Sequence, residues 1–167
     1  MKIAIISDTH DNIPNLEKTL TWLKSQDISL IIHCGDLCAP SILTNILVPK
    51  FSGKIHLIHG NVGDRELLTE KVKEFKNVRL HREVGEIKID GKNIAFVHEP
   101  DEAKKLAETG KYHLVFYGHN HKPWEEKIGQ TKLVNPGTLA GMFYKATFAV
   151  YETKTDKLEL KILEALK

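Results

Sequence analysis

A closely spaced pair of histidines has the most direct chemical meaning in this sequence. The segment Gly118-His119-Asn120-His121 follows Leu114–Tyr117, an apolar run with the composition of a short buried strand. Neutral imidazole is a common ligand of zinc, iron, manganese and nickel, and glycine lets the backbone turn sharply beside an ion. Taken alone, the pair is equally compatible with two exposed histidines of a loop.

Further ligand-type side chains follow the upstream strands that the sequence predicts. They are Asp8 and His10 after Lys2–Ser7, Asp36 after Leu30–His33, Asn61 after Lys54–His59, and His98 at the end of Asn93–Val97. Together with the histidine pair, five predicted strands end in residues that can bind a metal. Chance seldom aligns five such strand ends. This recurrence favours a metal site over exposed loop histidines.

The bulk composition is that of an ordinary globular protein with the size of one domain, here predicted to span residues 1–167. The chain is 41% hydrophobic, and its 24 basic and 22 acidic residues give a formal charge of +2. No basic block stands out, so we expect no nucleic-acid partner. Only three of the basic residues are arginines, which leaves few guanidinium groups for gripping phosphate. Metal charge would have to do most of that work.

The sequence also indicates where the protein resides. The apolar start Met1–Ser7 is too short for a signal peptide, and no segment approaches the roughly 20 apolar residues of a membrane span. Cys34 and Cys38 are the only cysteines, and we interpret them as reduced thiols. We therefore expect a cytoplasmic protein with no membrane partner.

Strands and helices are predicted to alternate in the first half of the chain. Pro14 opens a helix in its first turn, and further helices are expected over Pro40–Val48, ended by Pro49, and over Arg65–Phe75. With the strands named above, this order is β-α-β-α-β-α. That pattern is typical of a parallel sheet covered by helices.

The second half is predicted to consist mainly of antiparallel strands. Glu86–Ile89 alternates polar and apolar residues, and Asp90-Gly91 supplies a two-residue hairpin turn before Asn93–His98. A short helix over Asp101–Glu108 leads to the apolar run before the histidine pair. Later strands are expected at Glu125–Ile128, Thr131–Val134, Thr147–Tyr151 and Leu158–Leu163. The predicted fold is α/β, with two packed β-sheets flanked by helices.

Read in order, the motifs resemble those of the calcineurin-like metallophosphoesterase family. They are Asp8-Thr9-His10, Gly35-Asp36, Gly60-Asn61, His98 and Gly118-His119-Asn120-His121. In length and spacing the chain is similar to the small bacterial and archaeal phosphodiesterase branch, and Asn135-Pro136-Gly137-Thr138 looks like the late Asn-Pro-Gly-Ser of that branch. The resemblance runs from Met1 to about Tyr151. It implies a β-sandwich flanked by helices, in agreement with the pattern above.

This resemblance implies a centre of two divalent metal ions. Carried over by motif, one ion would be held by Asp8, His10, Asp36 and His121. The other would be held by Asp36, Asn61, His98 and His119, so that Asp36 bridges the two. Mixed nitrogen and oxygen ligands suit manganese, the expected metal, and also nickel, zinc, iron or cobalt. Two carboxylates among the seven ligands leave excess positive charge, which attracts phosphate and lowers the pKa of a bridging water.

The implied activity is hydrolysis of a small phosphodiester by hydroxide that bridges the two metal ions. Asp36, Asn61 and His119 are assigned to catalysis, and Arg65 and Asp64 are candidates for binding the substrate. A phosphomonoesterase or nucleotidase of the same fold would differ only in its substrate.

A non-catalytic scaffold is the alternative of a different class. The family also contains the small retromer scaffold subunit, which resembles these enzymes in fold and has lost metal ligands. Leu37-Cys38 and Lys122–Pro136 look rather like that subunit, whereas the complete ligand set favours an enzyme. The apolar segment Leu139–Tyr144 is either a surface for a homo-oligomer or a buried loop.

Two departures from the family pattern bear on catalysis. After Asn61 the family usually has a histidine or cysteine, whereas this chain has Val62-Gly63, which offers no side-chain proton donor. His98 is followed by Glu99 instead of the usual glycine. Glu99 either adds a carboxylate near the second ion or is a solvated loop residue. His59 and Glu99 are the alternatives for protonating a leaving group.

Overall fold

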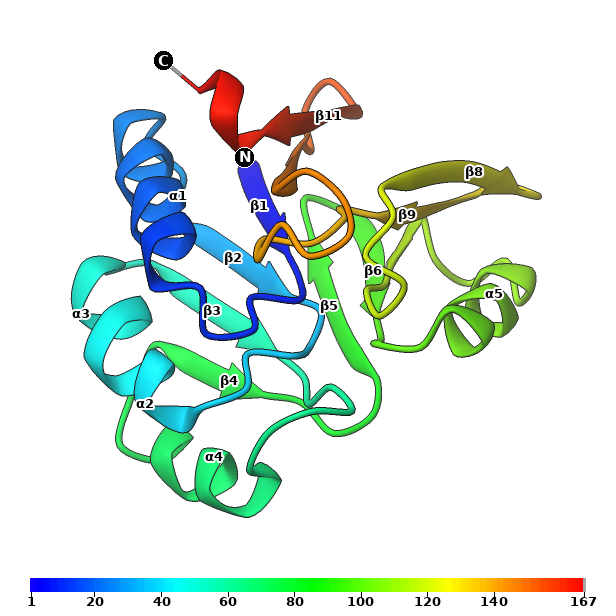
Figure 1. Ribbon diagram of the computed structural model, residues 1–167. Coiled ribbons are helices and arrows are strands. Elements are labelled where there is room, and N and C mark those ends of the chain that lie inside the picture. The colour runs from blue at the N-terminus through cyan, green and yellow to red at the C-terminus, as the bar shows by residue number, and fades with distance from the viewer. Residues whose placement is uncertain (167) are drawn as a thin grey trace.

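Two β-sheets lie face to face in the computed structural model, which describes residues 1–166 (Figure 1). The first sheet has the order β11 (Lys157–Ile162), β10 (Thr147–Glu152), β1 (Lys2–Ile6), β2 (Leu30–His33), β3 (Lys54–Leu57) and β4 (Val78–Leu80). The second has the order β5 (Gly85–Ile89), β6 (Lys92–Phe96), β7 (Leu114–Phe116), β9 (Thr131–Asn135) and β8 (Trp124–Ile128). The predicted sandwich of two sheets is thus confirmed.

Helices cover the outer face of each sheet. The first sheet is covered by α1 (Ile13–Ser25), α2 (Pro40–Ile42), α3 (Val48–Lys50) and α4 (Arg65–Val72), and the second by α5 (Pro100–Glu108), as Figure 1 shows. A 3-10 turn, η2 (Leu163–Ala165), follows β11. Within the described part of the chain, no helix is both long enough and apolar enough to cross a membrane.

The alternation of side chains along β1 explains the layers. Ala4 and Ile6 are fully buried in the core beneath the helices, while Ile3 and Ile5 are fully buried in the core between the two sheets. Successive side chains of a strand point to opposite faces, so a strand covered on both sides must be apolar throughout. The run of β-branched residues that predicted this strand therefore also reflects its central place in the fold.

The second half of the chain differs from the predicted antiparallel arrangement. β6, β7 and β9 pair in parallel, and only β5 and β8 run antiparallel to their neighbours. Parallel neighbours need a long crossover, which α5 provides between β6 and β7. β10 and β11 do not join this sheet but extend the first one, where β10 pairs with β1. Short apolar runs predict strands but not their partners.

The helix predicted to end at Pro49 instead continues to Lys50. Its middle is a π-helix, η1 (Leu43–Leu47), and Pro49 lies in the last turn. A proline cannot donate the usual hydrogen bond and its ring crowds the preceding turn. The wider π turn immediately before α3 gives the chain a local rearrangement that accommodates the proline. The three-residue strand β4 and the turn η2 were not predicted, since both are too short to show a periodic pattern.

Candidate metal centre

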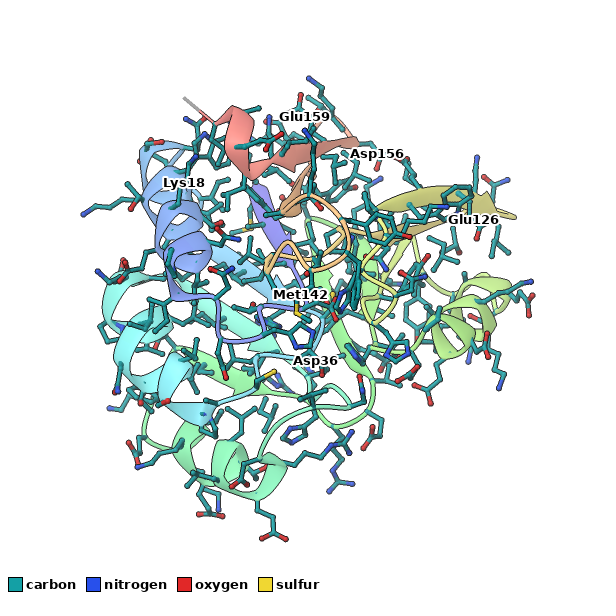
Figure 2. The ribbon with its side chains drawn as sticks, in the orientation of Figure 1. Lys18, Asp36, Glu126, Met142, Asp156 and Glu159 are labelled. Atoms are coloured by element: carbon teal, nitrogen blue, oxygen red, sulfur yellow. The ribbon has the colours of Figure 1, made fainter. Side chains whose placement is uncertain are left out.

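Loops that follow five parallel strands of the two sheets meet at one place. Figure 2 labels Asp36 near the middle of the view, where the loop after β2 meets the loop after β1. The predicted ligands follow β1, β2, β3, β6 and β7, and all seven are brought together there: Asp8, His10, Asp36, Asn61, His98, His119 and His121. Their role as metal ligands stays a prediction, which rests on the geometry described next.

Asp8, His10 and His121 form the first group. The Nε2 atoms of His10 and His121 lie 3.2 Å apart. Oδ1 of Asp8 lies 3.4 Å from Nε2 of His121 and 3.9 Å from Nε2 of His10. Three atoms that can each offer a lone pair thus face one another. Such atoms repel unless a proton or a cation lies between them, which is the arrangement that a metal site requires.

Asn61, His98 and His119 form the second group. Oδ1 of Asn61 lies 2.8 Å from Nε2 of His98 and 3.1 Å from Nδ1 of His119. Nδ1 of His98 lies 2.8 Å from the carbonyl oxygen of Cys34, and because a carbonyl only accepts, this nitrogen carries a hydrogen. In the neutral ring Nε2 then keeps its lone pair and points into the group.

The carboxylate of Asp36 lies between the two groups. Its Oδ2 atom is 3.6 Å from Nε2 of His10 and 3.4 Å from Nε2 of His98. Its Oδ1 atom accepts a hydrogen bond of 2.9 Å from the backbone N–H of Val62. One oxygen is therefore fixed by the backbone, and the other faces a nitrogen of each group.

An unusual backbone holds these side chains inward. Five of the predicted ligands have positive φ angles between 41° and 71°: Asp8, His10, Asp36, His119 and His121. For residues other than glycine this conformation costs of order 1–3 kcal/mol each, and it clusters at functional sites. Backbone hydrogen bonds fix it, since the N–H groups of Asp8 and Thr9 donate to the carbonyl oxygens of Gly35 and Asp36.

His33 braces two of the ligand loops. Its Nδ1 accepts a hydrogen bond of 3.2 Å from the N–H of Gly35, and its Nε2 donates one of 2.8 Å to Oγ1 of Thr9. Burial, the largest influence, lowers the pKa of His33 to about 3, so the ring stays neutral in this role. His33 therefore lies behind the ligands and ties together the loops after β1 and β2.

Asn135 has a similar role that the sequence did not reveal. Its Nδ2 donates to the carbonyl oxygen of Gly118 at 2.9 Å and to Oδ1 of Asn120 at 2.7 Å. Nearby, Oγ1 of Thr138 donates to the carbonyl oxygen of Asp8 at 3.0 Å. The Asn-Pro-Gly-Thr segment thus supports both the histidine pair and the loop after β1. The only sequence signal for it was its likeness to the family's late motif.

The remaining candidate residues lie around the cluster and not within it. Asp64 caps α4, its Oδ1 accepting from the N–H of Leu67 at 2.9 Å. Arg65 donates from Nη2 to the carbonyl oxygen of Gly60 at 2.7 Å and so supports the Asn61 loop. Nε2 of His59 lies 3.3 Å from Oγ1 of Thr69. Their roles toward a substrate stay predictions.

The pKa values of the two carboxylates in the cluster are shifted in opposite directions. Asp8 is fully buried, and this burial raises its pKa despite the nearby His98 and His121. Burial also acts to raise the pKa of Asp36, but hydrogen bonds from His98 and from the N–H of Val62 outweigh it and lower that pKa. A buried carboxylate that is only partly compensated is what a bound cation would stabilise, so the donor set fits divalent metal ions.

Gly60 is predicted to be required for this arrangement. A Cβ atom there would lie 1.8 Å from Oδ1 and 2.3 Å from the backbone N of Asp36. Gly60→Ala should displace the Asp36 carboxylate and weaken Mn²⁺ binding by roughly 10–100-fold, the loss typical of disturbed ligand support. Isothermal titration calorimetry measures this. The control is Gly129→Ala in the turn between β8 and β9, where the added Cβ meets nothing within 4 Å and the positive φ of 58° strains the backbone outside the ligand loops. Equal Mn²⁺ affinity in the two variants would contradict the prediction.

Metal affinity is predicted to rise with pH because of His98. Burial alone would lower its pKa, but hydrogen bonds to Asp36 and to the Cys34 carbonyl raise it above the ordinary 6.5. A metal ion must displace the proton from Nε2, so affinity falls by up to about tenfold per pH unit below the raised pKa and levels off above it. Titrations of Mn²⁺ from mildly acidic to mildly alkaline pH test this. A midpoint at or below 6.5 would be inconsistent with the raised pKa.

Comparisons with known proteins show which family this chain belongs to. The model of the calcineurin-like phosphoesterase superfamily domain matches residues 1–156. Phosphodiesterase MJ0936 of Methanocaldococcus jannaschii is 26% identical over 168 residues, which cover 98% of this chain and 100% of that protein. A probable metallophosphoesterase of Methanothermobacter thermautotrophicus is 28% identical over 145 residues, covering 83% of this chain and 77% of that protein.

Solved structures show the same fold. An archaeal phosphodiesterase superposes with a TM-score of 0.86 at 24% identity, covering 97% of this chain and 99% of that chain. Vps29 of Entamoeba histolytica, in complex with Zn²⁺, superposes with a TM-score of 0.68 at 18% identity, covering 98% of this chain and 99% of that chain. Because the family model matches residues 1–156 of the 167 residues, this chain belongs to the calcineurin-like phosphoesterase superfamily.

Proposed function

We propose that this protein is a metal-dependent phosphodiesterase that hydrolyses a small phosphodiester. The observation that carries the proposal is the position of Asp36, with one oxygen facing a nitrogen of each ligand group. A shared carboxylate is what a centre of two metal ions needs. The similarity to a named phosphodiesterase over the full length of both chains supports the choice of substrate class.

Each group would hold one divalent ion. Manganese is the expected metal, and nickel, zinc, iron and cobalt are the alternatives. One ion would be held by Asp8, His10, Asp36 and His121, and the other by Asp36, Asn61, His98 and His119. When bound, divalent ions supply positive charge that polarises phosphoryl oxygens and lowers the pKa of water.

The residues of this chain position and tune that centre. His98 is oriented by its hydrogen bond to the Cys34 carbonyl, and the neutral His33 keeps the first two ligand loops together. The side chain of His119 is 40% exposed, whereas that of Asp8 is fully buried. A substrate therefore reaches the centre from the His119 side, and Asp36, Asn61 and His119 are the residues we assign to catalysis.

Asp36 is predicted to be the ligand whose loss does most damage. Asp36→Ala removes the one side chain that faces both groups, so the protein should lose both equivalents of bound Mn²⁺ instead of one. Elemental analysis after gel filtration gives the stoichiometry. Asp101→Ala, at an exposed position of α5, is the control. Retention of two equivalents in Asp36→Ala would show that the bridging assignment is wrong.

The proposed activity is tested by measuring the rate of cleavage of phosphodiesters that differ in their leaving group. Directly after Asn61, neither Val62 nor Gly63 has a side chain that can donate a proton, and the carboxylate of Asp64 caps α4. A positioned general acid typically contributes ~10²–10⁴-fold. Without one, Mn²⁺-dependent rates should fall steeply as the leaving group's pKa rises, with nitrophenyl diesters cleaved far faster than alkyl diesters.

Graded aryl and alkyl diesters supply the measurement. A nearly flat dependence, with the chemical step rate-limiting, would mean that His59 or Glu99 acts as an acid. Absence of any Mn²⁺-stimulated cleavage would count against a phosphodiesterase. Faster turnover of monoesters than of diesters would instead indicate a phosphomonoesterase or nucleotidase.

A protein-binding scaffold is the second candidate function. One observation favours it: Met142, Phe143 and Tyr144 are exposed, and the Phe143 ring lies 5.8 Å from that of His121. An apolar loop beside the cluster suits a protein partner or a homo-oligomer. Full occupancy by two ions without turnover of any phosphoester would favour this function. A cytoplasmic location stays a prediction.

A further inference from the structure

Glu99, for which the sequence left open either a carboxylate near the second ion or a solvated loop residue, lies within reach of the second ligand group. Its Oε1 atom is 3.5 Å from Nδ1 of His119. Ligand atoms of His98, Glu99 and His119 all lie within 4.8 Å of one another. The Glu99 side chain is 42% exposed, so it stands at the open rim of the cluster.

The backbone around Glu99 fixes the point from which this side chain leaves the chain. Pro100 follows it, and a proline restricts the preceding residue to extended conformations, as the φ of −82° and ψ of 133° of Glu99 confirm. α5 is anchored by Ala103 and Ala107, both buried against the second sheet. The start of the helix, and Glu99 with it, is therefore held at a set distance from the β7 loop.

The carboxylate of Glu99 is not engaged in capping its helix. Asn12 and Asp64, the residues at the equivalent positions of α1 and α4, each accept a hydrogen bond from the helix backbone. Glu99 occupies that position in α5 but makes no side-chain capping bond within residues 1–166. Its charge is directed to the ligand group instead.

Lone pairs again converge at this point. Nδ1 of His119 faces Oδ1 of Asn61 at 3.1 Å and Oε1 of Glu99 at 3.5 Å. If Nδ1 is to bind a metal ion it must carry no hydrogen, and two oxygens facing its lone pair then need a cation among them. We propose that Glu99 is an additional ligand of the ion held by Asp36, Asn61, His98 and His119. This inference rests on the metal centre of the proposed function.

The charge of the two groups supports this assignment. Without Glu99, the first group contains the carboxylates of Asp8 and Asp36, but the second contains only the shared Asp36. Glu99 gives each ion two carboxylates, one of them shared. An additional oxygen ligand also favours harder cations such as manganese over softer ones. The alternative is that Glu99 only accepts a hydrogen bond from Nδ1 of His119 and contacts no ion.

The two alternatives predict different effects of Glu99→Gln on the affinity for Mn²⁺. A ligand that loses its charge should weaken binding of one of the two Mn²⁺ ions by about 10-fold or more and leave the other unchanged. If Glu99 instead only accepts a hydrogen bond from His119 and contacts no ion, its replacement should leave Mn²⁺ binding unchanged or strengthen it, because the hydrogen on Nδ1 that an ion must displace is then held less firmly. Glu102→Gln, an exposed position in the first turn of α5, is the matched control.

Two-site calorimetric titration with Mn²⁺ alone provides the readout, with thermal unfolding of both variants to verify the fold. The proposal would be supported if Glu99→Gln lowers the affinity for one of the two Mn²⁺ ions and Glu102→Gln lowers the affinity for neither. Unchanged or tighter binding in Glu99→Gln, or equal weakening in both variants, would overturn it. Two bound ions without phosphodiester cleavage would refute the proposed activity but leave the Glu99 result interpretable. Wild-type protein that binds no Mn²⁺ would overturn both.

Discussion

The structure of the centre depends on one carboxylate oxygen that must face two groups of ligands at once. Oδ2 of Asp36 can do so only because Oδ1 is held by the N–H of Val62 and because residue 60 has no Cβ. The loop after β3 therefore presses against the loop after β2, and it supplies Asn61 in the same turn. The position of the Asp36 carboxylate thus constrains the backbone of both loops and requires glycine at position 60.

The packing of the sheets converts this local constraint into a property of the whole fold. Ligands after β1, β2 and β3 come from the first sheet, and those after β6 and β7 come from the second. The apolar layer between the sheets sets the distance between these two sources, together with hydrogen bonds such as that between His98 and the Cys34 carbonyl. Residues of this layer, such as Ile5, Phe96 and Phe116, are fully buried. Close-packed cores hold such distances firmly, because even one added or lost methylene disturbs them.

The sequence predicted the strand ends and the polar side chains that follow them, because a buried strand followed by a polar residue is a local pattern. It did not predict that β6, β7 and β9 are parallel or that β10 pairs with β1, because strand partners depend on the whole chain. It also missed the bracing roles of His33 and Asn135. Their residue types signal nothing by themselves, and their function comes from hydrogen bonds between loops that are distant in sequence.

The strain in the ligand loops argues that the cluster exists to bind something. Five ligand residues with positive φ, each costing of order 1–3 kcal/mol, together with the fully buried Asp8, are unfavourable for folding alone. A small domain has only about 5–15 kcal/mol of net stability, so such costs must be offset. Hydrogen bonds from Asn135 and Thr138 offset part of them. Cations that bind only the folded state would add stability in proportion to the logarithm of their concentration over Kd. Metal binding and folding would then be coupled through the same strained loops, and the side chains that bind the ions would also be those that the ions stabilise.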